Sequence, residues 1–217
     1  RPCGYNYRFT TAFMEVYFQY VNSAEGLKTA VDEIRRSDLI GLDTETTELD
    51  PYRGELRLVQ LSDGKSTHVI DLRNFSNGDL KSNQDLLPLC ELLADPARTK
   101  IAHNAKFDAK WVRHHLGCEL NGIFDTYLAS QLIAAGDSER RHSLADAAQY
   151  FLGLELDKSM QVSDWSAAEL SHQQIEYAAR DAVIMRQLRD QMAERLRGDD
   201  LERVARLEFD CLMPIGQ

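Results

Sequence analysis

The sequence predicts an α/β fold in which a mixed β-sheet has helices on its faces. Three consecutive apolar stretches have strand-like patterns, and Asp63-Gly64 between the second and the third is a strong hairpin signal. We therefore expect an antiparallel three-strand meander. After residue 83, helical and strand-like patterns alternate, which is typical of parallel strands connected by helices. The meander strands are expected at residues 39–45, 56–61 and 68–72, with a turn at Pro51 and Gly54 between the first two.

The segment before the meander is expected to contain one strand and one helix. Residues 1–13 are aromatic and polar without a clear period, and we interpret them as an N-terminal extension or an expression remnant. Residues 14–20 have a strand-like pattern. Ser23 is a typical helix N-cap. The helix that follows has one apolar stripe, formed by Leu27, Val31 and Ile34.

The segment after the meander is expected to continue from a polar loop at residues 74–83 into alternating elements. Helices are predicted around residues 86–93, at 105–116 and at 127–135, and short strands at 100–103 and 123–124. Three further helices are predicted: one capped by Ser143, a long one from Ser171, and one that starts at Asp199 or Asp200 and stops at Pro214. Since no internal repeat or convincing linker is present, we expect one domain at residues 14–197 and a helical tail at residues 198–217.

The charge balance bears on the choice of partner. Forty-three per cent of residues are hydrophobic, as in an ordinary globular protein, and the formal net charge is −10. This charge disfavours a nucleic-acid partner at first sight, because phosphate contacts normally come from basic groups. Bound divalent cations would nevertheless restore positive charge where a phosphate binds.

Cysteine usage and hydropathy bear on the location of the protein. Cys3, Cys90, Cys118 and Cys211 are widely spaced, form no CxxC pair and have no histidine at zinc-finger spacing, so we expect reduced thiols. No apolar run reaches the roughly eighteen residues needed to cross a bilayer, and no secretory leader is evident. These observations predict an intracellular, cytoplasmic protein without membrane contact, and they leave its oligomeric state open.

Two acids lie at the end of the first meander strand. If residues 39–45 form a strand, Asp43 and Glu45 lie on the same face and Thr44 lies on the other. Two carboxylates held this close together repel each other unless a cation lies between them. The pair therefore favours a metal site, provided that other parts of the chain contribute ligands.

Two further acids are expected on helices. Asp108 lies in the first turn of the helix predicted at residues 105–116, directly after a strand. Asp181 follows Tyr177 by four residues in the long helix, so the two side chains share a helix face. Either aspartate alone is uninformative, because most helical aspartates are surface residues.

Taken together, these stretches resemble the three motifs of the DEDD 3′→5′ exonucleases. The motifs are Asp-x-Glu on a strand, Asn-x-x-Phe-Asp at a helix start and Tyr-x-x-x-Asp late in a helix, and they occur in that order without substitution. The tyrosine of the third motif resembles the subgroup that includes ribonuclease D, the Werner-type exonuclease and the proofreading domain of DNA polymerase I. The resemblance covers about residues 20–192.

This resemblance implies a ribonuclease H-like fold and two divalent metal ions, Mg²⁺ or Mn²⁺, about 4 Å apart. It implies hydrolysis of terminal phosphodiester bonds at the 3′ ends of single-stranded DNA or RNA, with release of nucleoside 5′-monophosphates. Such hard cations prefer carboxylate oxygens. By resemblance, Asp43 bridges both ions, Glu45 and Asp181 complete the site that holds the attacking water, Asp108 acts on the second ion, and Tyr177 orients the water.

Candidate substrate-binding residues surround the motifs, and several have a purely structural alternative. They are Thr44, Leu49, His103, Asn104, Phe107, Arg140 and Arg141. Asn104 would contact the terminal nucleotide or cap its helix, and Phe107 would face the substrate or the core. Leu49 would stack on the last base or pack within its loop. Arg140 and Arg141 would bind phosphates or be solvated.

Two functional alternatives remain at this stage. One is a non-catalytic module that binds nucleic acid or a polymerase partner, although such modules generally lose motif acids. A structural Ca²⁺ site is disfavoured because the four acids are spread along the chain. The sequence does not discriminate DNA from RNA, nor a freestanding enzyme from a domain of a longer protein.

Overall fold

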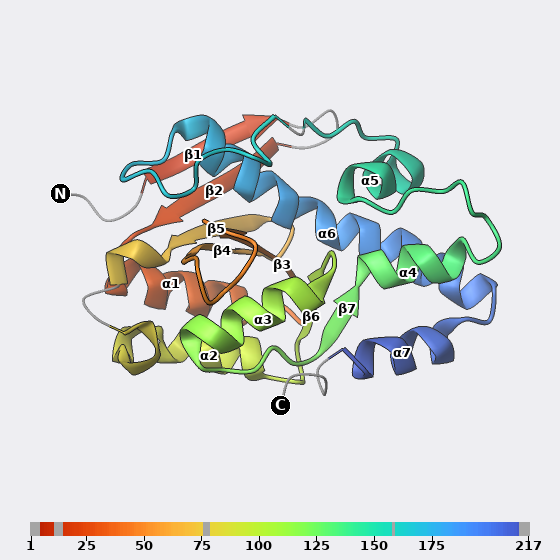
Figure 1. Cartoon of the computed structure of the whole chain (residues 1–217), viewed down its shortest axis with the longest axis horizontal. Helices are drawn as coiled ribbons and strands as arrows, with labels where there is room; N and C mark the ends of the chain where they lie inside the picture. The colour runs from red at the N-terminus through yellow and green to blue at the C-terminus, as the bar shows by residue number, and fades with distance from the viewer. Residues whose placement is uncertain (1–4, 11–14, 76–78, 158, 213–217) are drawn as a thin grey trace.

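A seven-stranded mixed sheet forms the centre of the computed structural model, which describes residues 5–10, 15–75, 79–157 and 159–212 (Figure 1). The strands follow the order β1-β2-β5-β4-β3-β6-β7 across the sheet. They are β1 (Tyr5–Thr10), β2 (Glu15–Val21), β3 (Leu39–Thr46), β4 (Leu56–Ser62), β5 (Ser66–Asp71), β6 (Thr99–Ala102) and β7 (Ile123–Asp125). The predicted antiparallel meander is present as β3, β4 and β5. Strands β6 and β7 extend the sheet in parallel from β3, so the mixed α/β sheet is confirmed.

The N-terminal part of the sheet differs from the prediction. Residues 5–10, which have no clear period, form β1 and pair antiparallel with β2. Strand β2 in turn pairs in parallel with β5 at the edge of the meander. Backbone hydrogen bonds between strands do not depend on side-chain alternation, so a strand at the sheet edge can form without the pattern used to find strands. The rest of residues 1–13 lies outside the described residues.

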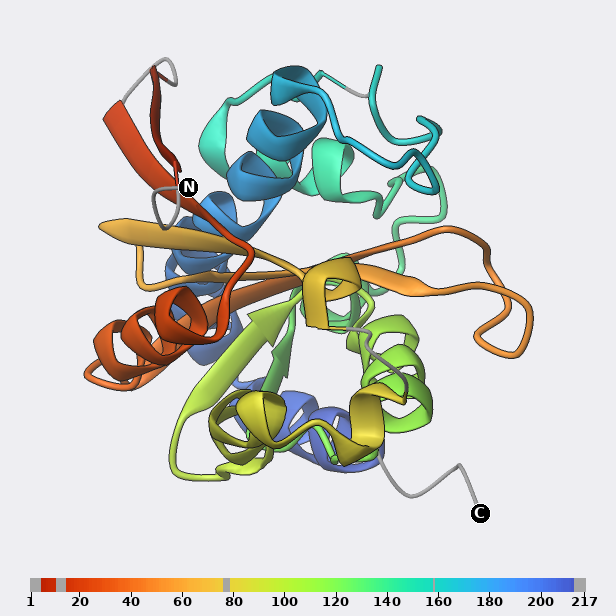
Figure 2. The same cartoon turned by 90° about the vertical axis from the view of Figure 1, so that its left-hand side faces the viewer.

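Helices cover both faces of the sheet (Figure 2). They are α1 (Ala24–Ile34), α2 (Leu87–Ala94), α3 (Ala105–Leu116), α4 (Thr126–Ile133), α5 (Leu144–Leu152), α6 (His172–Gly198) and α7 (Glu202–Asp210), with short 3₁₀ turns η1 (Leu72–Phe75), η2 (Leu80–Ser82) and η3 (Gln84–Leu86). One core cluster joins α1, α2 and α3 to one face of the sheet, and a second joins α6 to the other. A third cluster packs α4, α5 and α7 against α6. None of the described helices is both long and apolar enough to cross a membrane.

Serine caps start three of the helices as the sequence predicts. The Ser23 and Ser143 side chains accept hydrogen bonds from the backbone N–H groups of their first helical turns. Ser171 forms a reciprocal capping box with Gln174 at the start of α6. These caps fix where each helix begins. In α6 the capping box thereby sets the positions of Tyr177 and Asp181 further along the helix.

The start of α7 was predicted two or three residues too early. Asp199 is the C-cap of α6, and Asp200 has a left-handed backbone with φ of 58°. The chain therefore changes direction at these acids before α7 begins at Glu202. Acidic residues favour helix starts, but here their ability to adopt turn conformations prevails. The predicted stop at Pro214 lies outside the described residues.

Strand β3 and helix α6 approach each other at Gly41. A Cβ atom at this position would lie 2.1 Å from the carbonyl oxygen of Ala182, closer than atoms can pack. Glycine is therefore required here for steric reasons, although its backbone is extended. The contact holds the middle of α6 directly against the strand that carries the first predicted motif.

A buried arginine ties the segment before α6 to the sheet. Arg57 on β4 is 1% exposed and forms two hydrogen bonds of 3.0 Å with Asp71 on β5. It also donates to the carbonyl oxygens of Trp165 and Ala167. Since Arg57 is satisfied by these partners, its charge can stay buried. Trp165 is buried against the α6 face of the sheet, as expected of a structural residue.

Candidate active site

A cavity of about 380 Å³ opens where the end of β3 meets the start of α3 and the first half of α6. Asp43 and Glu45 reach it from β3, Asp108 from α3, and Tyr177 and Asp181 from α6. The structure thus brings together all four predicted acids and the predicted tyrosine. They come from three segments that are distant in sequence and are held together by the sheet.

Asp43 and Glu45 lie on the face of β3 that packs against α6. Residues two apart on a strand share a face, and Gly41, two residues before Asp43, contacts α6. Thr44 lies on the opposite face, where its hydroxyl donates a hydrogen bond of 2.6 Å to Asp108 Oδ1. Its hydroxyl therefore orients an acid of the site, although Thr44 was predicted to bind substrate.

The start of α3 is held by an aspartate that the sequence analysis missed. Asp125, at the end of β7, accepts hydrogen bonds from the backbone N–H groups of Asn104 and Ala105, at 3.1 and 2.9 Å. It also caps α4. Asn104 has a left-handed backbone with φ of 64°, and its side chain makes no capping hydrogen bond, so the side-chain capping alternative is wrong. The signal for Asp125 was an aspartate between a strand and a helix, which is a typical N-cap position.

Burial raises the pKa values of all four acids, and repulsion from neighbouring site acids adds to the shift for Asp43 and Glu45. Burial is the largest cause for Asp43 and Glu45, and the charges of the other acids add to it. Burial raises the pKa of Asp108 to about 7, against the opposing hydrogen bond from Thr44. Burial raises the pKa of Asp181 to about 6, while the charge of Arg180 and the Tyr177 hydroxyl oppose the shift. Arg180, whose Nε atom lies 3.9 Å from Asp181 Oδ1, therefore only partly compensates the negative charge of the site.

The donor set fits hard divalent cations. All four acids supply carboxylate oxygens, and the buried Oδ1 atom of Asp181 has no hydrogen-bond partner. In the part of the chain that the structure describes, no three His, Cys, Asp or Glu side chains are arranged so that they could hold a metal ion as they stand. Side-chain rotation within the cavity is thus needed to bring the carboxylate oxygens around an ion.

Tyr177 lies one turn before Asp181 on α6. Burial raises the pKa of the Tyr177 phenol above its usual value, and the charges of Asp181, Glu45 and Asp43 add to the shift. The phenol is therefore protonated at neutral pH and suited to donate a hydrogen bond rather than to accept a proton.

The other predicted substrate-binding residues fall into two groups. His103, Asn104 and Phe107 line the cavity. His103 contacts Thr126 through Nδ1 at 2.9 Å, and burial lowers its pKa to about 4, so it is neutral at pH 7. Phe107 also packs against the core cluster of α1, α2 and α3, so its core role is confirmed, and its contact with substrate stays a prediction.

The second group lies outside the cavity lining. Leu49, on the loop between β3 and β4, is 85% exposed. Arg140 places its guanidinium 3.5 Å from the ring centre of Tyr150, and Arg141 is exposed. Four further residues line the cavity that were not predicted from the sequence as site residues. They are Tyr127, Ser143, Leu144 and Gln161.

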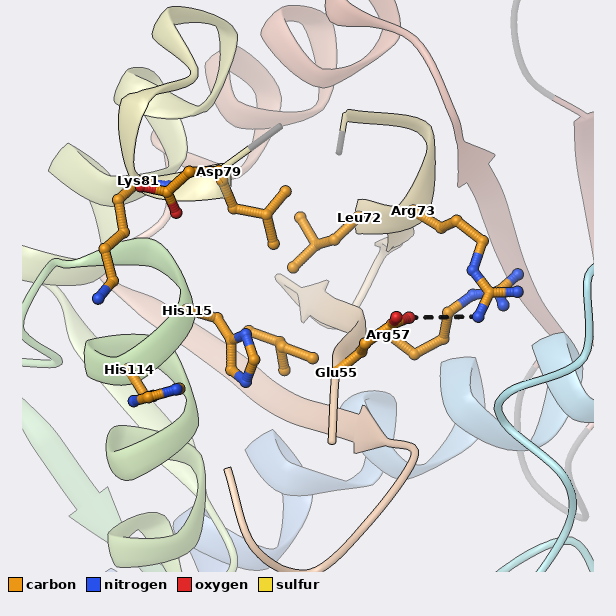
Figure 3. Close-up of a pocket in the computed structure, with 10 residues that line it drawn as sticks. Glu55, Arg57, Leu72, Arg73, Asp79, Lys81, His114 and His115 are labelled. Carbon is orange, nitrogen blue, oxygen red and sulfur yellow. Dashed lines mark hydrogen bonds and ion pairs between the residues drawn. The ribbon is translucent and has the colours of Figure 1, made fainter. Parts of the chain in front are cut away.

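A second cavity, of about 310 Å³, lies between the start of β4, η1, η2 and the end of α3 (Figure 3). Its arginines are already engaged: Arg73 pairs with Glu55 at 3.3 Å, and Arg57 pairs with Asp71. His114 and His115 border it from α3, and it has no group of converging acids comparable to the first cavity. The chemistry predicted from the sequence therefore belongs to the first cavity.

A family model described as 3′-5′ exonuclease matches residues 18–197. The chain belongs to the 3′–5′ exonuclease family. DNA polymerase I of Aquifex aeolicus is 39% identical over 186 residues, which are 86% of this chain and 29% of the polymerase. Ribonuclease D of Gluconacetobacter diazotrophicus is 33% identical over 189 residues, which are 87% of this chain and 44% of that enzyme. The chain thus spans less than half the length of these relatives.

Solved structures of exonuclease relatives have the same fold. Brucella melitensis NrnC bound to pGG aligns with a TM-score of 0.72 and 33% identity over 82% of each chain. Escherichia coli RNase D aligns with a TM-score of 0.78 and 25% identity, covering 90% of this chain and 49% of that one. The predicted ribonuclease H-like fold and the predicted family are confirmed, and the relatives named as exonucleases are hydrolases.

Proposed function

We propose that this chain is a metal-dependent 3′→5′ exonuclease that removes nucleoside 5′-monophosphates from single-stranded DNA or RNA. The observation that carries the proposal is the convergence of Asp43, Glu45, Asp108 and Asp181 with Tyr177 in one cavity of an exonuclease-family chain. One solved NrnC structure holds bound Mg²⁺ and another is bound to pGG, which supports the same cofactor and ligand class here.

The four carboxylates would hold two divalent cations, Mg²⁺ or Mn²⁺. The bound ions would supply a hydroxide nucleophile and stabilise the charge on the departing 3′ oxygen. The charges of Glu45, Asp108 and Asp181 each raise the pKa of Asp43, and this supports a bridging role for Asp43. Thr44 fixes the orientation of Asp108. The Tyr177 hydroxyl would donate a hydrogen bond that orients the attacking water.

Two exposed residues of the β3–β4 loop are proposed to contact substrate outside the cavity. Leu49 and Tyr52 are 85% and 82% exposed on the β3–β4 loop, which directly follows the Asp43 strand. Exposed apolar and aromatic side chains can stack on bases without sequence preference, which suits a single-strand substrate. We also retain residues 14–197 as the proposed exonuclease domain and residues 198–217 as its helical tail.

The activity and its direction are tested with end-labelled oligonucleotides. In Mg²⁺ or Mn²⁺, a 5′-labelled single strand should shorten stepwise, and a 3′-labelled strand should release labelled mononucleotide at once. Matched DNA and RNA strands, assayed side by side, establish the preferred sugar. Long internal fragments from the 3′-labelled strand would contradict the direction, and full activity in EDTA would contradict the metal dependence. Binding without cleavage would support the non-catalytic module instead.

Replacement of Tyr177 with Phe is expected to lower the single-turnover rate by roughly 10- to 100-fold, because the loss of one hydrogen bond to a charged group costs about 1.5–3 kcal/mol. The fold should be unaffected, since the ring is retained. The matched control is Tyr127→Phe, whose hydroxyl also borders the cavity region but accepts from Gln131. We expect the control to retain most of the activity. A Tyr177→Phe rate equal to wild type would show that the phenol does not position the water.

A further inference from the structure

Gln60 is a buried amide with no hydrogen-bond partner in the structure. It lies in the middle of β4 and is 0% exposed, and neither its Oε1 nor its Nε2 atom is bonded. A buried amide normally forms hydrogen bonds, because removing it from water without a new partner is energetically unfavourable. Gln60 does not line the cavity, so neither substrate nor bulk water reaches it there.

The strand register places Gln60 next to Asp43. Gln60 is the antiparallel partner of Asp43 on β3 and is paired with Val69 on β5. Directly opposed residues of paired strands share a face, with Cβ atoms about 4.5–5.5 Å apart. The neighbouring positions on this face of β4 are Leu58 and Ser62.

Among these neighbours, Asp43 is the available polar partner. Val69 and Leu58 are apolar and pack with α6. The Ser62 hydroxyl is already engaged, since it bonds Thr67 Oγ1 at 2.9 Å and accepts from the Gly64 N–H at 3.1 Å. The Asp43 carboxylate offers acceptor oxygens, and an amide N–H is the type of donor that a carboxylate binds.

We propose that Gln60 is a positioning residue for Asp43, and that its Nε2 group donates to one Asp43 oxygen when the carboxylate binds cations. The proposal rests on the proposed metal-dependent function. The hydrogen bond fixes the orientation of the carboxylate and leaves its remaining lone pairs for the metal ions. Groups that orient metal ligands in this way typically change metal affinity by roughly 10- to 100-fold when they are replaced.

The test is metal binding by Gln60→Met, which keeps the length of the side chain and removes both polar atoms. We expect its dissociation constant for Mn²⁺, measured from the paramagnetic resonance signal of the free ion, to rise roughly 10- to 100-fold. The unfolding temperature of the metal-free protein should equal or exceed that of wild type, because an unpaired amide is removed. At saturating Mn²⁺ the KM for an oligonucleotide should be unchanged.

Ser62→Ala provides the matched control on the same strand and face. It removes a buried hydroxyl that bonds other partners, so it should lower the unfolding temperature and leave Mn²⁺ affinity unchanged. Wild-type Mn²⁺ affinity in Gln60→Met would overturn the role of Gln60, whatever its stability. Failure of the wild-type protein to bind Mn²⁺, or equal binding by wild type and Asp43→Asn, would instead remove the proposed function.

Discussion

Replacement of Asp43 with Asn is expected to lower kcat at least about a thousandfold while raising the thermal stability of the metal-free protein. Lewis-acid stabilisation of the transition state is worth several kcal/mol, and about 4 kcal/mol corresponds to a thousandfold. The stability gain follows from the site itself. Asp43 is surrounded by Glu45, Asp108 and Asp181, whose charges all raise its pKa, so a neutral side chain of the same shape relieves repulsion.

The Asp43→Asn experiment compares kcat with the unfolding temperature in EDTA. Asp32→Asn, a change at an exposed position of α1, removes the same charge without touching the cavity and should leave both quantities near wild type. If Asp43→Asn kept substantial activity, the bridging role of this residue would be wrong. If it unfolded at a lower temperature than wild type in EDTA, the loss of activity would have to be attributed to the fold.

Mg²⁺ is expected to stabilise the protein strongly at pH 8 and hardly at all at pH 5. At a metal concentration roughly 100 times the dissociation constant, stabilisation of about 2.7 kcal/mol corresponds to a rise of about 5–10 °C in the unfolding temperature for a chain of this size. Below the raised pKa values, of about 7 for Asp108 and about 6 for Asp181, protons occupy the carboxylates and compete with the metal.

The metal-free protein should show the opposite pH dependence. The carboxyl groups have raised pKa values in the folded state, so between pH 3.8 and about 7 the folded state binds more protons than the unfolded state. The free energy of unfolding from these groups therefore falls as the pH rises through that window. Thermal scans in EDTA and in Mg²⁺ across pH 5–8 check both statements. The same Mg²⁺ effect at pH 5 and pH 8, or in a variant with Asp43 and Asp181 both replaced by Asn, would contradict a carboxylate metal site.

The main features of the site could be predicted from local spacing. Alternation on a strand places Asp43 beside Glu45, and the four-residue interval places Tyr177 beside Asp181. These geometric rules act within a single element. The meeting of the two pairs with Asp108 depends on long-range pairing of strands and helices, and it was anticipated through resemblance to a family and not through spacing alone.

The features that the sequence did not reveal depend on contacts between distant segments. Strand β1 is defined by backbone pairing, and the parallel pairing of β2 with β5 joins residues that are about fifty positions apart. Asp125 supports the start of α3 from a neighbouring strand. Gln60 resembles any polar residue in an apolar strand until the register places it opposite Asp43. His103 was predicted to bind substrate, and its burial, which the sequence did not indicate, makes it neutral at pH 7.

The contact at Gly41 links the backbone geometry of the site to its reaction rate. Because β3 touches α6 there without an intervening side chain, any larger residue at this position would push the helix away from the strand. Tyr177 and Asp181 belong to the same rigid rod, so both would move away from Asp43 together. The methyl group of an alanine at position 41 would thus increase the distance between Asp43 on β3 and the two α6 residues. The reaction rate would fall because of this distance alone, although every reacting group is still present.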